Sequence, residues 1–472
     1  MLPRTCPSKS DLQLGQALEQ KSLMQRPWDV RLYSAIAFLF SVAYALGLQR
    51  MMRSLTPDGL YFHPWSSETM MQTVSLKFLR EAPVRTLLSI HIQPPAFDAI
   101  RAALALPFRH LSDAAAVRQV DLALYTFGAL ILAMLVAMVF RWLAEYSLAV
   151  ACVGTLLLLL HPASIFFATF LDSTLLSSFL VARTYFVLWK LKKGQATSIM
   201  GFSLLVLALF FTRSVFQWPA ILVFALCLYL LGVRRRLLVT FLATTCLISG
   251  LYLAKQAYQF GLLSTTSFSG ISLANSIGVG FETETYTTYL EHVEDYASID
   301  PSLPGVLTSR TKINGEPNFN NLAYLELNRR LLARYGAALR HASLQRLAAS
   351  YLENALIYFM PTSTYSSHVI VDHLPWTRPY NAVFSAPVLP ILLLISFLIW
   401  AARAVRLRTL RKGVGLILPA LYILTVCIFS DKGENLRFKF WLEPIMLVFL
   451  ISQFHAVAQQ LRSASKRRQV SA

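Results

Sequence analysis

The chain has 472 residues, of which 56% are hydrophobic and only 14% are charged. This composition excludes an ordinary soluble protein, in which about 25% of the residues are charged. The formal net charge is +19. Its distribution along the chain follows membrane topology, so it does not indicate a nucleic-acid partner.

Ten apolar windows predict membrane-spanning helices, because about 20 apolar residues are enough to cross a bilayer. We therefore expect an all-α integral membrane protein with a bundle of about ten transmembrane helices. The predicted spans are 32–48, 121–140, 146–160, 175–189, 198–211, 218–231, 237–254, 383–402, 414–429 and 440–455. The first span lacks a small-residue cleavage pattern, so we expect a retained anchor instead of a signal peptide.

The positive charge lies on one side of these predicted spans. If the N-terminus is cytoplasmic, both termini and the even-numbered loops share that side, and lysine and arginine far outnumber acidic residues there. The main basic clusters are 190–193, 234–236, 403–412 and 462–468. This excess predicts a multi-pass protein with both termini in the cytoplasm.

Three parts follow from the predicted spans. Residues 1–254 form an N-terminal transmembrane module, whose first outer loop (49–120) carries the candidate catalytic groups. Residues 255–382 form a large outer segment, and 383–472 form the C-terminal transmembrane helices with a basic cytoplasmic tail. Residues 344–361 are apolar enough to lie against the bilayer or to enter it, and the sequence leaves both options open.

The first outer loop is rich in polar side chains and predicts two amphipathic helices. One begins near Ser67 and Glu68, and the other covers 97–109, after the Pro94–Pro95 turn. Helices of this kind lie in the membrane interface or pack on protein, and both interpretations stay open. An acidic residue at the start of a helix also has a structural use, because it complements the helix dipole.

Charged residues of the outer loops suggest a site for group transfer. The candidates are four acids in the first two outer loops and four cations in the later ones. The acids are Asp58, Glu68, Asp98 and Asp172, and the cations are Arg213, Lys432, Arg437 and Lys439. A carboxylate can take the proton of an attacking hydroxyl, while nearby cations hold a phosphate and stabilise its charge as it leaves.

Several short motifs resemble the GT-C glycosyltransferases, in particular the dolichyl-phosphate-mannose-protein mannosyltransferase-like group and its bacterial relatives. They are the H-x-Q-P-P turn at 91–95, FLDSTLL in the second outer loop, TRSVFQ after the fifth span and GENLRFKFWLEP near the end. The resemblance implies an inverting single displacement of a sugar from a polyprenyl-phosphate donor to a glycan, lipid or protein acceptor. It covers the whole topology, although each motif is short.

The resemblance also implies residue roles. Glu68 matches the position of the catalytic acidic residue in the first loop, and Asp172 matches a second acidic position. Many relatives carry two adjacent acids in the first loop, whereas this chain has Ser66-Ser67-Glu68, so Asp58 stays open as the alternative base. The residues implied in substrate binding are His91, Gln93, Arg213, Lys432, Arg437 and Lys439. Members differ in metal dependence, so a divalent cation at Glu68 or Asp172 is also left open.

Two rival functions remain at this stage. A transporter or flippase for lipid-linked saccharides predicts internal repeats and polar residues within the spans. A polymerase or ligase would use a diphosphate-linked oligosaccharide. The chain has no internal repeat and few charges within its spans, which favours the enzyme. Compact loops favour a bacterial inner membrane. The His368, Asp372, His373 group has the spacing of a metal site, but spacing alone is weak evidence.

Overall fold

The structure is a computed structural model that describes residues 27–55, 66–279, 300–362, 374–385, 387–406, 408–432 and 435–471. Every regular element in these ranges is a helix, and they contain no β-strand beyond one isolated bridge between Thr311 and Pro317. The predicted all-α class is therefore confirmed for the described residues.

Six helices of the described chain are long and apolar enough to cross a membrane. They are α2 (Pro27–Leu55), α7 (Asp113–Leu143), α13 (Arg235–Phe260), α22 (Val388–Arg406), α23 (Leu410–Ser430) and α25 (Glu443–Ser471). Each coincides with one of the ten predicted spans. This set of apolar helices is compatible with a multi-pass membrane protein.

The other four predicted spans form shorter or less apolar helices. They are α8 (Leu148–Leu160), α10 (Thr174–Lys192), α11 (Ile199–Thr212) and α12 (Trp218–Leu230). The chain bends by 56° between α8 and α9 (Pro162–Thr169), and this pair counts as one further span at most. The described chain thus supports six or seven spanning helices instead of ten.

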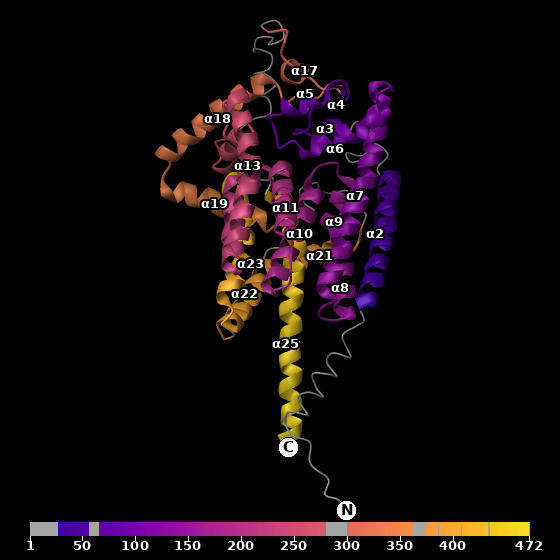
Figure 1. The fold of residues 1–472 in the computed structure, drawn as a ribbon, viewed down its shortest axis with the longest axis vertical. Helices are drawn as coiled ribbons and strands as arrows, with labels where there is room; N and C mark the ends of the chain where they lie inside the picture. The colour runs from indigo at the N-terminus through magenta and orange to yellow at the C-terminus, as the bar shows by residue number, and fades with distance from the viewer. Residues whose placement is uncertain are drawn as a thin grey trace, which may run out of the picture.

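The long helices run along the long axis of the molecule (Figure 1). A layer of short helices covers one end, which we call the upper end, and α25 extends beyond the opposite, lower end. The upper layer contains α3 (Ser66–Thr69), α4 (Leu76–Glu81), α5 (Pro83–Leu88), α6 (Ala96–Ala105), the 3-10 helix η1 (Leu106–Phe108) and α17 (Gly305–Thr308). The helix predicted at 97–109 is matched by α6 and η1, whereas the one predicted from Ser67 is wrong as a continuous helix, because α3 ends at Thr69 and α4 begins only at Leu76.

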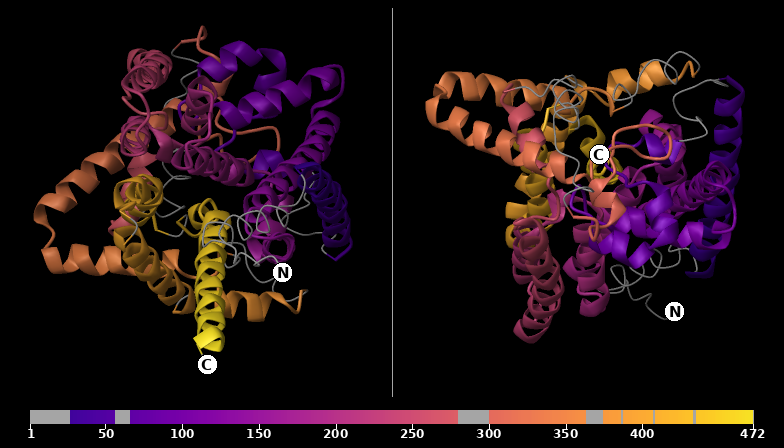
Figure 2. Two further views of the ribbon diagram at one scale, coloured as in Figure 1. Left: turned by 60° about the horizontal axis from the view of Figure 1, so that its bottom comes forward. Right: turned by 90° about the horizontal axis from the view of Figure 1, so that it is seen from above.

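Helices α18 (Leu322–His341) and α19 (Leu344–Tyr358) form a hairpin that projects from one side of the molecule (Figures 1 and 2). The end of α19 returns to the bundle, where Asn354 donates hydrogen bonds to the carbonyls of Ser276 and Ile428. The remaining short elements are η2 (Ser214–Phe216), α14 (Ser269–Ser276), α21 (Thr377–Val383) and α24 (Asn435–Lys439).

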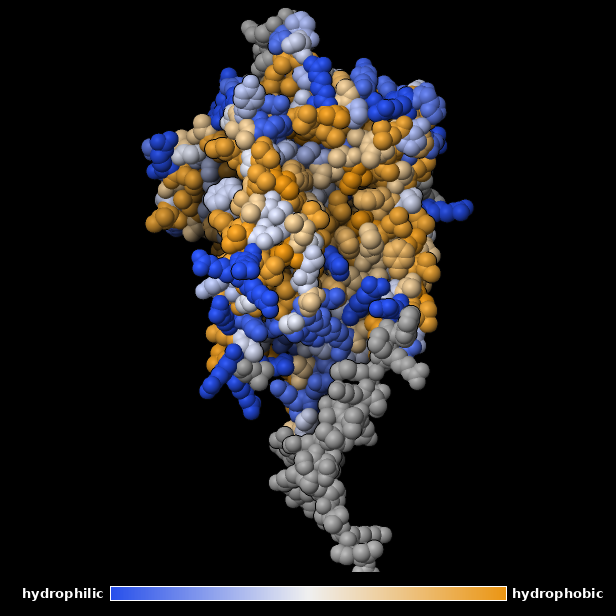
Figure 3. Space-filling view, viewed as in Figure 1, coloured by the Kyte–Doolittle hydropathy of each residue, from blue (hydrophilic) through white to orange (hydrophobic). Residues whose placement is uncertain are grey.

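Two hydrophobic cores hold these elements together. The larger core lies among the long helices, and the smaller one joins the upper layer to α14 and α18. In the smaller core, Ile92, Phe97 and Tyr324 are at least 95% buried although they come from distant segments. Figure 3 shows apolar side chains over the middle of the molecule and hydrophilic ones at both ends, as expected for a bilayer-embedded bundle.

Candidate functional site

A cavity of about 200 Å³ lies between the upper layer and the ends of α10, α11 and α24. Asp172, Arg213 and Arg437 line it together with the amides Gln72 and Gln93, and we call it the Asp172 cavity. A second cavity of about 170 Å³ adjoins it and shares Gln72, Gln93 and Arg213 with it. The structure thus brings together four of the residues that the sequence singled out.

Asp172 lies in the short connection between α9 and α10. Its Oδ1 accepts a hydrogen bond of 2.8 Å from the backbone N–H of Thr174, so the carboxylate caps the start of α10. Its Oδ2 accepts from the Thr174 hydroxyl at 2.5 Å. The same Oδ2 lies 2.8 Å from Arg213 Nη2 and 3.2 Å from Arg437 Nη1. One carboxylate oxygen therefore sits between two guanidinium groups.

The two arginines reach Asp172 from different helices. Arg213 is the C-cap residue of α11. It donates a hydrogen bond of 3.2 Å to Gln72 Oε1, and its guanidinium lies 5.8 Å from the centre of the Trp441 ring. Arg437 belongs to α24. The side chains of both arginines and of Asp172 are only 7–8% exposed. Among the described residues that line the cavity, two are cations and one is an acid, a set that suits a phosphate ligand.

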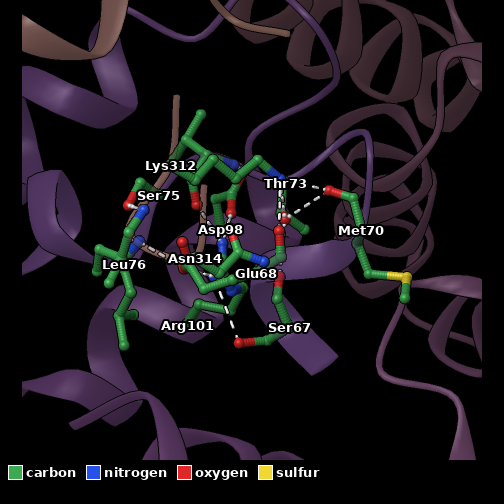
Figure 4. Close-up of polar contacts among 12 residues, drawn as sticks. Ser67, Glu68, Met70, Thr73, Ser75, Leu76, Asp98, Arg101, Lys312 and Asn314 are labelled. Atoms are coloured by element: carbon green, nitrogen blue, oxygen red, sulfur yellow. Dashed lines mark hydrogen bonds and ion pairs between the residues drawn. The ribbon is translucent and has the colours of Figure 1, made fainter. Parts of the chain in front are cut away.

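Glu68 lies in a different environment (Figure 4). Its side chain is completely buried, and its Oε1 accepts from the Leu76 backbone N–H and from Arg101 Nη2, both at 2.7 Å. Arg101 also pairs with Asp98 at 2.7 Å. Lys312 donates to the Glu68 backbone carbonyl at 2.9 Å. We call Glu68, Asp98, Arg101 and Lys312 the buried ion cluster. Glu68 lines neither cavity, so this geometry favours a structural role for its carboxylate.

The charges of the buried ion cluster balance, since it holds two acids and two bases. Burial raises the pKa of Asp98, although Arg101 opposes the shift. Burial acts to lower the pKa of Arg101, but Asp98 and Glu68 outweigh it and the pKa rises. Burial lowers the pKa of Lys312 to about 8, against the attraction of Glu68. The cluster ties the first outer loop to residues 300–321, because Lys312 is the only member that comes from outside this loop.

Gln93 links the two sites. Its Nε2 donates to Asp98 Oδ2 at 3.0 Å, while the residue lines both cavities. The buried ion cluster therefore holds in place one wall of the Asp172 cavity.

His91 is completely buried and does not line either cavity. Its Nε2 lies 2.9 Å from the Asn320 carbonyl, and its Nδ1 lies 2.9 Å from Ser267 Oγ. Since a carbonyl only accepts, Nε2 carries the proton and Nδ1 accepts from the serine. Burial lowers the pKa of His91 to about 3. This histidine is neutral and joins the first outer loop to the segments that contain Ser267 and Asn320.

His91 gives the protein a specific sensitivity to acid. Below pH 6.5 the unfolded chain binds a proton at this histidine, whereas the folded chain does so only near pH 3. The free energy of unfolding should therefore fall by about 1.4 kcal/mol per pH unit as the pH drops from 6.5 toward 3. His91→Asn should remove this part of the slope in thermal unfolding measured in nanodiscs. His110→Asn, at an exposed histidine, is the control, and an equal slope in both variants would contradict the assignment.

The other two predicted cations lie away from the cavity. Lys432 pairs with Glu353 at 2.7 Å, and both side chains are substantially exposed. Lys439 is completely buried, donates to the Met360 carbonyl and lies 3.3 Å from Glu443. Neither lysine lines the Asp172 cavity.

Several candidates cannot be placed, and others were not foreseen. Asp58, His368, Asp372 and His373 lie outside the described residues. Five residues of these sites carry no pattern in the sequence that assigns them to a site: Gln72, Thr174, Trp441, Arg101 and Lys312. The only local signal was the Asp98–Arg101 spacing, which places both side chains on one face of a helix.

The residues around Asp172 do not fit a divalent cation. Both of its oxygens already accept hydrogen bonds, and two guanidinium groups would repel a metal ion there. In the described part of the chain, no three His, Cys, Asp or Glu side chains come together.

Comparison of the chain with protein families, curated proteins and solved structures found no match.

Proposed function

We propose that the protein is a membrane glycosyltransferase of the GT-C type, which moves a sugar from a polyprenyl-phosphate carrier to a hydroxyl acceptor. The observation that supports this most is the Asp172 cavity, where one carboxylate and two guanidinium groups line the same space. Six helices of the described chain are long enough to span a bilayer, and one of them, α23, lines the adjoining cavity. That setting suits a donor whose lipid tail stays in the membrane while its phosphate enters the protein.

Arg213 and Arg437 would hold the phosphate of the donor. Each guanidinium presents a fork of N–H groups that matches two phosphate oxygens, and both forks already converge on one oxygen of Asp172. As the bond between sugar and phosphate breaks, negative charge grows on the phosphate. Two fixed cations stabilise this charge without reorganising, which is a major source of rate enhancement.

Asp172 would act as the general base. When the donor phosphate attracts the two guanidinium groups, Oδ2 becomes able to accept the proton of the acceptor hydroxyl. The hydroxyl oxygen forms a bond to the anomeric carbon, and the bond from that carbon to the phosphate oxygen breaks. The lipid phosphate leaves with the electron pair, so the sugar is transferred in one inverting step. The catalytic roles of Glu68 and Asp58 implied by the resemblance stay predictions.

We also propose where the acceptor binds and how the protein is oriented in the membrane. Residues 255–382 would shape the acceptor site. The upper end would face outward and the basic lower end would face the cytoplasm of a bacterial cell, with both termini there. Gln93 would contact the substrate from the wall that the two cavities share.

The proposal is tested with purified protein in nanodiscs and a series of radiolabelled polyprenyl-phosphate sugars. We expect label to move to a hydroxyl acceptor with inversion, and the Arg213→Met variant to abolish this transfer. Turnover of diphosphate-linked oligosaccharides alone would show a polymerase or ligase. If no donor is consumed but sealed vesicles accumulate the lipid-linked sugar on the opposite leaflet, the protein is a transporter and the proposal is wrong.

A further inference from the structure

An apolar groove of about 340 Å³ lies on the lower half of the bundle, away from the Asp172 cavity. It is formed by α7, α10, α22, α23 and α25, and aromatic side chains make up much of its wall. These are Trp142, Tyr146, Tyr185, Trp189, Phe397, Trp400 and Phe449. Tryptophan and tyrosine are enriched where a protein meets the membrane interface. The aromatic lining of the groove is therefore typical of a binding site for a membrane lipid.

The length of the groove matches one leaflet of a bilayer. Ile445 and Gln453 both line it and are eight residues apart on α25, which corresponds to about 12 Å along the helix. One leaflet has a hydrocarbon depth of about 15 Å. An acyl chain of a single leaflet fits this length, with its headgroup at the lower end.

Cations gather at the headgroup position. Lys192 lines the groove, Arg403 lies one helical turn after the lining residue Trp400, and Lys412 directly precedes the lining residue Gly413. No carboxylate of the described chain forms an ion pair with any of these three residues. Lys193 differs, because it pairs with Glu145 and lies 4.0 Å from the centre of the Trp189 ring. Three cations beside an apolar groove, with no ion-pair partner in the described part of the chain, favour an anionic ligand.

A buried polar atom in the groove wall also favours a bound lipid. The side-chain Oε1 of Gln453 is buried in the groove wall, and no donor among the described residues reaches it. A buried acceptor without a partner costs free energy, which a hydroxyl or amine of a bound lipid would recover.

We propose that this groove binds one anionic phospholipid, with an acyl chain along α25 and the phosphate at Lys192, Arg403 and Lys412. This site is independent of the proposed sugar transfer. The lipid would close the gap between α10, α22 and α23 and so stabilise the lower half of the bundle.

The test measures lipid binding directly by native mass spectrometry. Protein delipidated in detergent is titrated with phosphatidylglycerol or with phosphatidylcholine of the same chain length. We expect one phosphatidylglycerol to bind with at least tenfold preference. Lys192→Gln with Arg403→Gln should weaken it by about thirtyfold, since each basic residue contributes about 1 kcal/mol. The matched control is Arg235→Gln with Arg236→Gln, which removes two exposed cations from the start of α13.

A second variant fills the groove without changing charge. Ala420→Phe should abolish binding of phosphatidylglycerol, whereas Ala243→Phe, on an exposed face of α13, should leave it unchanged. Equal binding of both lipids, or binding that survives the charge and groove variants, would overturn the proposal. So would displacement of phosphatidylglycerol by an equal concentration of polyprenyl phosphate, which would identify the groove as a site for the carrier.

Discussion

Asp172→Asn is expected to lower the rate of sugar transfer by about 10²–10⁴-fold, the usual effect of removing a general base. The amide has nearly the same shape as the carboxylate, and its oxygen can still accept the backbone hydrogen bond that caps α10. It cannot accept a proton from the acceptor. The measurement is single-turnover transfer at saturating donor, so that the chemical step is observed apart from donor binding.

The matched control is Glu68→Gln, the same change from acid to amide within the buried ion cluster. Because Glu68 contacts Arg101 and lines neither cavity, we expect this variant to transfer sugar at a rate within about tenfold of the unmodified protein. Full transfer by Asp172→Asn, together with loss of transfer in a folded Glu68→Gln variant, would contradict our assignment. The base would then be Glu68, as the family resemblance implies.

Spanning helices could be predicted from the sequence where length and apolar composition agree. The windows at 32–48 and 121–140 became α2 and α7, which are 29 and 31 residues long. The windows at 198–211 and 218–231 became α11 and α12, with 14 and 13 residues. Helices this short do not cross the hydrocarbon core, for which about 20 residues are needed. Composition reports that a segment is apolar, but not where its helix begins and ends.

The candidate site could be predicted only in its separate parts. Asp172 and Arg213 stand out because each is the single charge of its predicted outer loop, and Arg437 stands out as part of the cationic last outer loop. Their convergence cannot be inferred from one sequence, since Arg213 and Arg437 are 41 and 265 positions from Asp172. Glu68 illustrates the same limit, because its partner Arg101 is 33 positions away. A carboxylate that faces a cavity and one that faces a buried arginine look alike in the sequence.

Arg101→Met is expected to lower the free energy of unfolding by about 3–5 kcal/mol. The substitution keeps most of the side-chain volume but removes the cation that pairs with Glu68 and Asp98. Both carboxylates would then be buried with Lys312 as the only remaining cation of the cluster. Thermal unfolding in nanodiscs measures the change. The control is Arg330→Met, which removes an exposed pair with Glu326 and should change stability by less than about 1 kcal/mol.

The loss caused by Arg101→Met should also depend on pH. Burial already raises the pKa of Asp98, and without Arg101 the pKa should rise further. In acid, Asp98 can then bind a proton in the folded protein and lose its unbalanced charge. The stability difference from the unmodified protein should therefore shrink as the pH falls, and Asp98→Asn added to Arg101→Met should restore part of the stability at neutral pH. If Arg101→Met costs no more than Arg330→Met at every pH, water must reach the cluster, and Glu68 would be accessible enough to act as a base.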